Sequence, residues 1–333
     1  MRIAIVYNTW HAGGCEMRAA EICQVLREQG DEVFLVGTAL TVEGAEVLRR
    51  YQLGAECMHI VGAGDNHRQL LYDCVAGLRP DVVDVQWVCS APEFPFPTVA
   101  TGHGDIPLPE AGRFHGYITV ESFEPEYAGN SIAPVYAEIW NWVDCGKFAF
   151  NEELGDGWCF FGRLFKADNL RAVWDRYGGR IHIYGMRYPE DSWIDQVPPN
   201  VRWMGLGNPI ETMRQYRVVF GSARVALEAL ASGRFVLAGQ PWTGWIPETR
   251  LVQPHLLPEM SARQFATRAR VGTPNLAPEP WADSIIAELL STFCENLAMR
   301  QACRTYIEDQ HEMRKQIGKI RRVYEQVIEV GNV

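Results

Sequence analysis

The sequence has no apolar run that approaches the roughly 18 residues of a membrane-spanning helix. No charged and then apolar leader follows Met1, so we expect a protein that stays in the cytoplasm. The nine cysteines include no CxxC pair, and an odd number cannot all pair within one chain. We therefore interpret the thiols as reduced core residues.

Metal-binding motifs and an excess of positive charge are also missing. The eight histidines form no HExxH pair, so the sequence predicts no metal site. Lysine and arginine number 31 against 41 acidic residues, a net charge of −10. This balance weighs against nucleic acid as a partner, because binding to phosphates needs clustered cations. The locally basic stretch 313–322 is interpreted as a solvated helix face, with peripheral contact to anionic lipid as the alternative.

The composition is that of a folded protein with more than one domain. Hydrophobic residues make up 47% and charged residues 22% of the 333 positions. A chain of this length is typically divided into about two domains.

Apolar runs alternate with helical patterns through the first half. The run 2–8 predicts a buried strand, a helix follows from about Cys15 to Gly30, and 32–37 predicts a second strand. Further strands at 56–61, 82–87, 98–101 and 117–120 alternate with helices at 42–53 and 66–78. This alternation predicts a parallel sheet covered on both faces.

The same pattern starts again in the second half. Strands are predicted at 158–162, 181–185 and 201–205, with a helix at 168–177, and a long terminal helix spans about 281–329 with a break near 309. We predict two Rossmann-like lobes with a ligand cleft at the carboxyl ends of their strands. The predicted domains are 1–148, 149–310 and a returning helix at 311–333.

The segment 217–239 is the most informative part of the chain. It reads as a strand, a helix that carries Glu228, a stop at Ser232-Gly233, and another strand. Free amides at the start of such a helix attract phosphate through unpaired N–H groups and the helix dipole. A carboxylate about two turns further on can accept hydrogen bonds from ribose hydroxyls. The segment therefore predicts half of a nucleotide-binding unit.

Two further loops follow predicted strands. Gly13 and Gly14 come after the first strand and let a ligand approach the backbone, although a simple tight turn is an equal alternative. They do not match GxGxxG, so a nicotinamide cofactor is not favoured. His103 lies between two glycines at the end of strand 98–101. We interpret it as a functional residue, with a structural histidine in a turn as the alternative.

The segment 217–239 resembles the sugar-nucleotide signature of retaining glycosyltransferases with the GT-B fold, specifically glycosyltransferase family 4. Other matching motifs follow in the family's order over almost the whole chain: Gly13-Gly14, His103, the connector 141–148, Phe161-Gly162-Arg163 and Glu228. The resemblance implies an α/β, GT-B architecture. In it, two Rossmann-like domains face each other across a cleft, and a C-terminal helix returns to the first domain.

The resemblance also implies roles for single residues. His103 would touch the transferred sugar near its anomeric carbon, and Arg163 would meet the donor diphosphate. The family's lysine usually comes five residues after this arginine, whereas here Lys166 lies three residues after it. Glu228 would bind ribose. The remaining contacts to donor or acceptor would come from Gly13, Gly14, Ser222, Ala223 and Arg224.

One motif departs from the family. The signature has two glutamates separated by seven residues, and the position of the first is occupied by Phe220. This leaves the donor sugar and full catalytic competence open.

We therefore expect a retaining glycosyltransferase that moves a sugar from a nucleotide-diphosphate sugar to an acceptor hydroxyl, without a metal or cofactor. The acceptor could be a saccharide, a lipid-linked molecule or another hydroxyl compound. A nucleotide-sugar epimerase of the same fold is one alternative, although no proton-abstracting set is identified for it. A non-catalytic sugar-nucleotide-binding protein is the other, motivated by Phe220.

Overall fold

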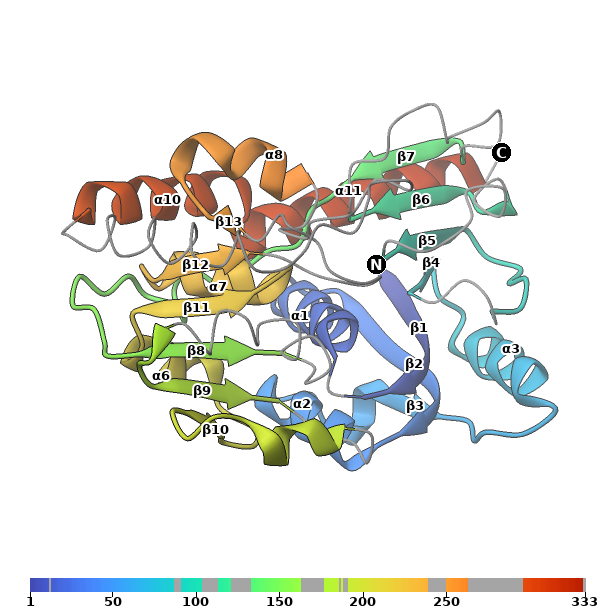
Figure 1. The fold of residues 1–333 in the computed structure, drawn as a ribbon. Helices are drawn as coiled ribbons and strands as arrows, with labels where there is room; N and C mark the ends of the chain where they lie inside the picture. Colours follow the sequence, from blue (N-terminus) through green and yellow to red (C-terminus); the bar gives the residue numbers. More distant parts are fainter. Residues whose placement is uncertain are drawn as a thin grey trace, which may run out of the picture. The chain divides into compact units, whose positions relative to one another are not determined.

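The computed structural model describes residues 1–11, 13–86, 91–103, 113–120, 133–162, 177–185, 187, 191–238, 250–262 and 296–331. It divides into two compact units. The first consists of Met1–Trp140 and Arg314–Val333, and the second of Asn141–Met313. Each is built on a largely parallel sheet with helices, which confirms the predicted α/β class (Figure 1). The predicted boundaries at 148/149 and 310/311 both lie inside the second unit.

The first unit has a seven-stranded sheet in the order β3-β2-β1-β4-β5-β6-β7, and every neighbouring pair is parallel. Its strands are β1 (Arg2–Trp10), β2 (Glu32–Leu40), β3 (Met58–Ile60), β4 (Val82–Val85), β5 (Thr98–Gly102), β6 (Gly116–Thr119) and β7 (Val135–Glu138). Its helices are α1 (Gly14–Glu28), α2 (Val42–Arg50), α3 (His67–Leu78) and α11 (Met313–Gly331). Apart from β7, each of these elements matches a predicted run.

Strand β4 shows how the two faces of this sheet differ. Val83 and Val85 pack in one cluster with Leu71 and Val75 of α3. Successive side chains of a strand point to opposite faces, so Asp84 is directed away from α3. It is fully buried. A charged residue there needs polar partners, and these come from the end of β4, from β5 and from α11.

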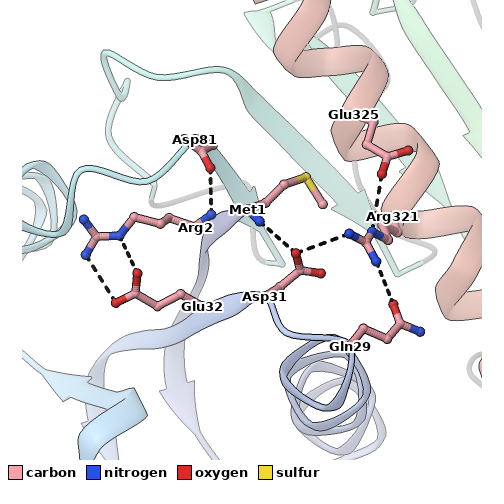
Figure 2. A network of polar contacts seen from close by, with 8 residues as sticks. All are labelled: Met1, Arg2, Gln29, Asp31, Glu32, Asp81, Arg321 and Glu325. Carbon is pink, nitrogen blue, oxygen red and sulfur yellow. Dashed lines mark hydrogen bonds and ion pairs between the residues drawn. The ribbon is translucent and has the colours of Figure 1, made fainter.

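Helix α11 packs on the sheet of the first unit, as the predicted returning helix. A polar network ties it to the start of the chain (Figure 2). The guanidinium of Arg321 lies 3.4 Å from Oδ1 of Asp31 and donates to Oε1 of Gln29 at 3.2 Å. The same Asp31 oxygen accepts from the amino group of Met1 at 2.8 Å.

Close packing and a second ion pair extend this attachment. A Cβ on Gly116 of β6 would come 2.5 Å from Cγ2 of Val327, so the approach of α11 requires glycine there. Arg314 pairs with Glu28 at 2.7 Å. Arg314 and Arg321 of the basic stretch 313–322 therefore take part in ion pairs that attach the helix.

The second unit has a six-stranded sheet in the order β10-β9-β8-β11-β12-β13. Only the last pair is antiparallel. The strands are β8 (Trp158–Phe161), β9 (Ile181–Tyr184), β10 (Val201–Trp203), β11 (Val218–Gly221), β12 (Phe235–Ala238) and β13 (Arg250–Leu251). The helices are α6 (Pro209–Thr212), α7 (Arg224–Ala231), α8 (Leu257–Ala262) and α10 (Leu297–Gln310). The predicted break near 309 is confirmed, because α10 ends at Gln310 and α11 begins at Met313.

Alternation along β8 divides the core of the second unit into two layers. Trp158 and Phe160 belong to one cluster, and Cys159 and Phe161 belong to another that includes residues of α7 and α10. The predicted strand ends at 162 and 185 are close to those observed. The predicted helix at 168–177, except for its last residue, lies outside the described residues, as does the start of the predicted terminal helix.

Arg304 on α10 holds the segment that opens the second unit. Its guanidinium donates to the carbonyl oxygens of Cys145, Phe148 and Ala231 at 2.6 to 2.8 Å. Ala231 is the last residue of α7, where unpaired carbonyls give the helix end a partial negative charge. The guanidinium of Arg304 therefore joins α10, α7 and the segment before β8.

Within the described ranges, no helix combines the length and the apolar character that a membrane crossing would require.

Candidate functional site

In the first unit the predicted residue His103 lies beside Gln86, a residue that was not predicted, and each follows one of two adjacent parallel strands. His103 follows β5, and Gln86 follows β4, its neighbour in the sheet. The Nε2 atom of His103 lies 2.9 Å from Oε1 of Gln86. The carboxyl ends of parallel strands meet at one edge, where ligands of such folds bind. The two side chains therefore form a pair at the expected edge.

Asp84 anchors Gln86. The amide nitrogen of Gln86 donates to Oδ2 of Asp84 at 2.7 Å and lies 3.2 Å from Oγ1 of Thr101. Thr101 in turn donates to Oδ1 of Asp84 at 3.0 Å. Tyr324 of α11 donates to Oδ2 at 2.5 Å. Three donors thus converge on one buried carboxylate.

Burial dominates the ionisation of this network. It raises the pKa of Asp84, while hydrogen bonds from Tyr324 and Thr101 and the charge of Arg18 oppose the rise. Arg18 on α1 is 1% exposed, and burial lowers its pKa to about 10. Burial, followed by the charge of Arg18, lowers the pKa of His103 to about 3. His103 is therefore a neutral imidazole at physiological pH.

Gly13 and Gly14 lie at the start of α1, and Gly13 is its N-cap. A Cβ on Gly13 would come 2.3 Å from Oε2 of Glu16, a buried carboxylate in the first turn. Burial, with Cys15 and Glu16 nearby, raises the pKa of Tyr7. A negative charge already lies at this helix start, which makes it a poor site for phosphate.

The start of α7 in the second unit differs from the start of α1, because its first turn has no acidic residue. β11 ends at Gly221 and α7 begins at Arg224, so only Ser222 and Ala223 connect them. Ala223 has φ 50° and ψ −125°, which a residue with a side chain rarely adopts. Such strain collects at functional sites. The first turn of α7 contains no acidic residue, so its amides suit an anion better than those of α1.

Glu228 is held by Arg224 one turn earlier on α7. The Nε atom of Arg224 donates to Oε1 of Glu228 at 2.7 Å. Glu228 is 2% exposed. A buried carboxylate with a charged donor has a fixed orientation. The predicted cation Arg224 and the predicted ribose ligand Glu228 therefore form one ion pair.

Phe220 lies within β11, and its side chain is 1% exposed. Its ring centroid is 5.5 Å from that of Trp158 in the sheet core. In the family that the sequence resembles, the first glutamate of the signature would occupy this position. The short connection after Gly221 leaves no loop at this point that could carry such a residue.

The end of β8 lies beside this junction, because β8 and β11 are parallel neighbours. Gly162 follows β8 with φ 147°, which is within the region that favours glycine. The predicted diphosphate ligands Arg163 and Lys166 lie outside the described residues. The chain enters that segment from the same sheet edge as Ser222.

Sequence reasoning missed the residues behind His103. Asp84, Gln86, Arg18 and Tyr324 are not recognisable as a group, because they come from distant parts of the chain. One signal was available: Asp84 interrupts the apolar run 82–87. A carboxylate in a buried strand requires donors, and this requirement alone indicates a polar network.

Comparison with known proteins gives structural matches only. No family model and no curated protein sequence matches the chain. HepE of Anabaena, solved with UDP and glucose, matches with a TM-score of 0.70 and 13% identity, covering 98% of this chain and 100% of its own. The pneumococcal O-GlcNAc transferase GtfA, solved with UDP and GlcNAc, matches with a TM-score of 0.68, 10% identity, and coverage of 98% and 99%.

WaaG, a glycosyltransferase involved in lipopolysaccharide biosynthesis, matches with a TM-score of 0.65 and 11% identity over 96% of this chain and 99% of its own. Identities this low relate folds and not activities. The likeness nevertheless extends over nearly the full length of each chain. This protein therefore has the GT-B fold found in glycosyltransferases.

Proposed function

We propose that this protein is a glycosyltransferase that moves a sugar from a nucleotide-diphosphate sugar to an acceptor hydroxyl. The junction between β11 and α7 carries the proposal. A strained two-residue turn there precedes a helix start free of acidic residues, followed by the buried pair Arg224 and Glu228. The shared fold with glycosyltransferases solved with UDP supports this reading. UDP-sugars are therefore the first donors to test.

In this proposal the second unit binds the donor. Glu228 accepts hydrogen bonds from the ribose, and Arg224 holds the carboxylate in place. The amides after β11, together with Arg163 and Lys166, contact the diphosphate. Cations and aligned amides offset the charge that develops on the departing nucleotide, and this lowers the barrier.

The first unit contributes Gly13, Gly14 and His103 on the acceptor side. We propose a retaining, metal-independent reaction of the family 4 type. The departing diphosphate assists attack by the acceptor from the same face, so no carboxylate nucleophile of the enzyme is needed. A cytoplasmic location is part of the proposal, as is an acceptor among saccharides, lipid-linked molecules or other hydroxyl compounds.

The test measures kcat/KM for UDP-, GDP-, ADP- and dTDP-sugars with the variants Glu228→Ala and Arg163→Ala. Each should lower kcat/KM at least about tenfold, because each removes a charged contact to the donor. Glu211→Ala and Arg202→Ala, on exposed side chains of the same unit, are the matched controls. Unchanged kcat/KM in both site variants would remove the assignment.

Phe220 favours a second candidate, a non-catalytic protein that binds sugar nucleotides. The absent glutamate lies near the donor sugar in the resembling family, whereas the ribose and phosphate contacts do not depend on it. Saturable nucleotide binding without turnover over a broad acceptor panel would support this candidate over the transferase.

A further inference from the structure

The carboxamide of Gln86 has different partners at its two ends. Its nitrogen contacts Asp84 and Thr101, and its oxygen contacts Nε2 of His103. A carboxylate can only accept hydrogen bonds, so the end that contacts Asp84 must be the NH₂ group. The oxygen is then fixed toward the histidine. The orientation of the amide follows from its partners.

An amide oxygen is only an acceptor, so the His103 nitrogen that contacts it must donate. In a neutral imidazole one nitrogen carries the proton and the other carries a lone pair. The contact with Gln86 therefore places the proton on Nε2. Nδ1 is left as the acceptor of the ring, and within the described part of the chain no hydrogen bond to Nδ1 is recorded.

We propose that Gln86 is a positioning residue that holds His103 in the Nε2–H tautomer, so that Nδ1 accepts a hydrogen bond from a hydroxyl group of the ligand. The assignment of the ligand rests on the proposed function, whereas the tautomer does not. The network behind Gln86 makes this state the stable one. Turning the amide would direct its oxygen at Asp84, where two acceptors would face each other.

The anchor of the amide is itself rigid. Asp84 accepts from Gln86, Thr101 and Tyr324, and it lies near the charge of Arg18. These donors come from the end of β4, from β5 and from α11, a helix near the other end of the chain. A fully connected buried network of this kind specifies a single arrangement.

The tautomer has a consequence for substrate recognition. A neutral ring that accepts at Nδ1 suits a hydroxyl, and it cannot offset the charge of a diphosphate. The low pKa of His103 agrees with this role. The first unit would therefore recognise sugar or acceptor hydroxyls, and recognition of phosphate is left to the second unit.

Side-chain nitrogen NMR of the ¹⁵N-labelled wild-type protein at pH 7 tests the tautomer directly. His103→Gln identifies the resonances. We expect a proton on Nε2 and a lone pair on Nδ1. A proton on Nδ1, or on both nitrogens, overturns the proposal. Because the tautomer is read in the wild type, this measurement decides the matter even if Gln86→Met does not fold.

Gln86→Met tests the positioning role, because it keeps the length of the side chain and removes the amide. We expect both tautomers in the spectrum, and a fall in kcat of roughly 10- to 100-fold with KM changed much less. An unchanged tautomer with wild-type kcat overturns the proposal. Tyr324→Phe is the matched control for the spectrum: it removes a donor from Asp84 but leaves Gln86 in place, so the tautomer should persist.

The two proposals fail in different ways. If no nucleotide sugar is turned over, the transferase proposal fails, while the spectrum still decides the role of Gln86. If turnover is found but the proton lies on Nδ1, only the inference about Gln86 falls.

Discussion

The hydroxyl of Tyr324 donates a hydrogen bond of 2.5 Å to Oδ2 of Asp84, which lies 240 positions earlier in the chain. Both side chains are fully buried. The contact fastens α11 to the centre of the first sheet. It is also one of the three hydrogen bonds that the carboxylate of Asp84, the anchor of Gln86, accepts.

Tyr324→Phe should destabilise the first unit. The change leaves the ring in place but removes one donor from a buried carboxylate, and hydrogen bonds to charged groups contribute about 1.5–3 kcal/mol. The free energy of unfolding, measured by denaturant titration, should fall by about this amount. Tyr136→Phe, at a residue that is 43% exposed, is the control. Equal stabilities of the two variants would contradict the role given to the contact.

The pH dependence of stability should report on His103. Its pKa is lowered to about 3 in the folded protein, against about 6.5 in an unfolded chain. Below pH 6.5 the unfolded chain binds a proton that the folded protein does not bind until about pH 3. Stability is therefore lost as the pH falls, by about 2 kcal/mol between pH 7 and 5.

His103→Gln should remove this loss of stability between pH 7 and 5, because glutamine does not titrate. The measurement is the free energy of unfolding of wild type and variant at pH 7, 6 and 5. His255→Gln, at an exposed position, is the matched control. If the stability of the variant depended on pH as that of the wild type does, His103 would take up its proton at the same pH in the folded and the unfolded protein.

Arg304→Met should destabilise the second unit. The substitution removes the fork that satisfies three carbonyl oxygens, and the expected loss is about 2–4 kcal/mol. Arg304→Lys should recover only part of this, because an ammonium lacks the planar fork. Thermal unfolding of both variants, with Arg202→Met as the exposed control, checks whether methionine destabilises the protein more than lysine does. Full recovery by lysine would show that charge alone matters.

Phe220→Glu should unfold the second unit and not restore the missing glutamate. Position 220 lies in the sheet core beside Trp158, so a carboxylate there would be buried without a partner. We expect insoluble protein or a strongly lowered melting temperature, with Phe220→Leu much milder. A soluble Phe220→Glu protein with wild-type stability and raised turnover would refute this placement of the residue.

The sequence was sufficient to predict most of the parallel strands. Runs such as 2–8 and 217–221 are apolar because both faces of the sheet are covered. Helix α7 ends just before Gly233, which has a φ of 74° that favours glycine. The strand β7 was missed: its burial alternates between partly buried and exposed residues, which gives a weaker signal.

The site was less predictable than the fold. Local motifs led to His103 and Glu228 as candidates, because each comes soon after a strand that reads clearly in the sequence. The partners of these two residues differ in how far the sequence could predict them. Arg224 lies one helical turn from Glu228, so the pair could have been read from the spacing of four residues. The network of Asp84 and Tyr324 depends on tertiary packing, which no local pattern contains.

Binding of UDP to the wild type and to Glu228→Gln, measured by titration calorimetry, tests the central claim most directly. The substitution keeps the size of the side chain and removes its charge. The account predicts saturable binding of one UDP to the wild type and at least about tenfold weaker binding to the variant. Equal affinity in the two proteins, or no saturable binding of UDP, GDP, ADP or dTDP to the wild type, would contradict it.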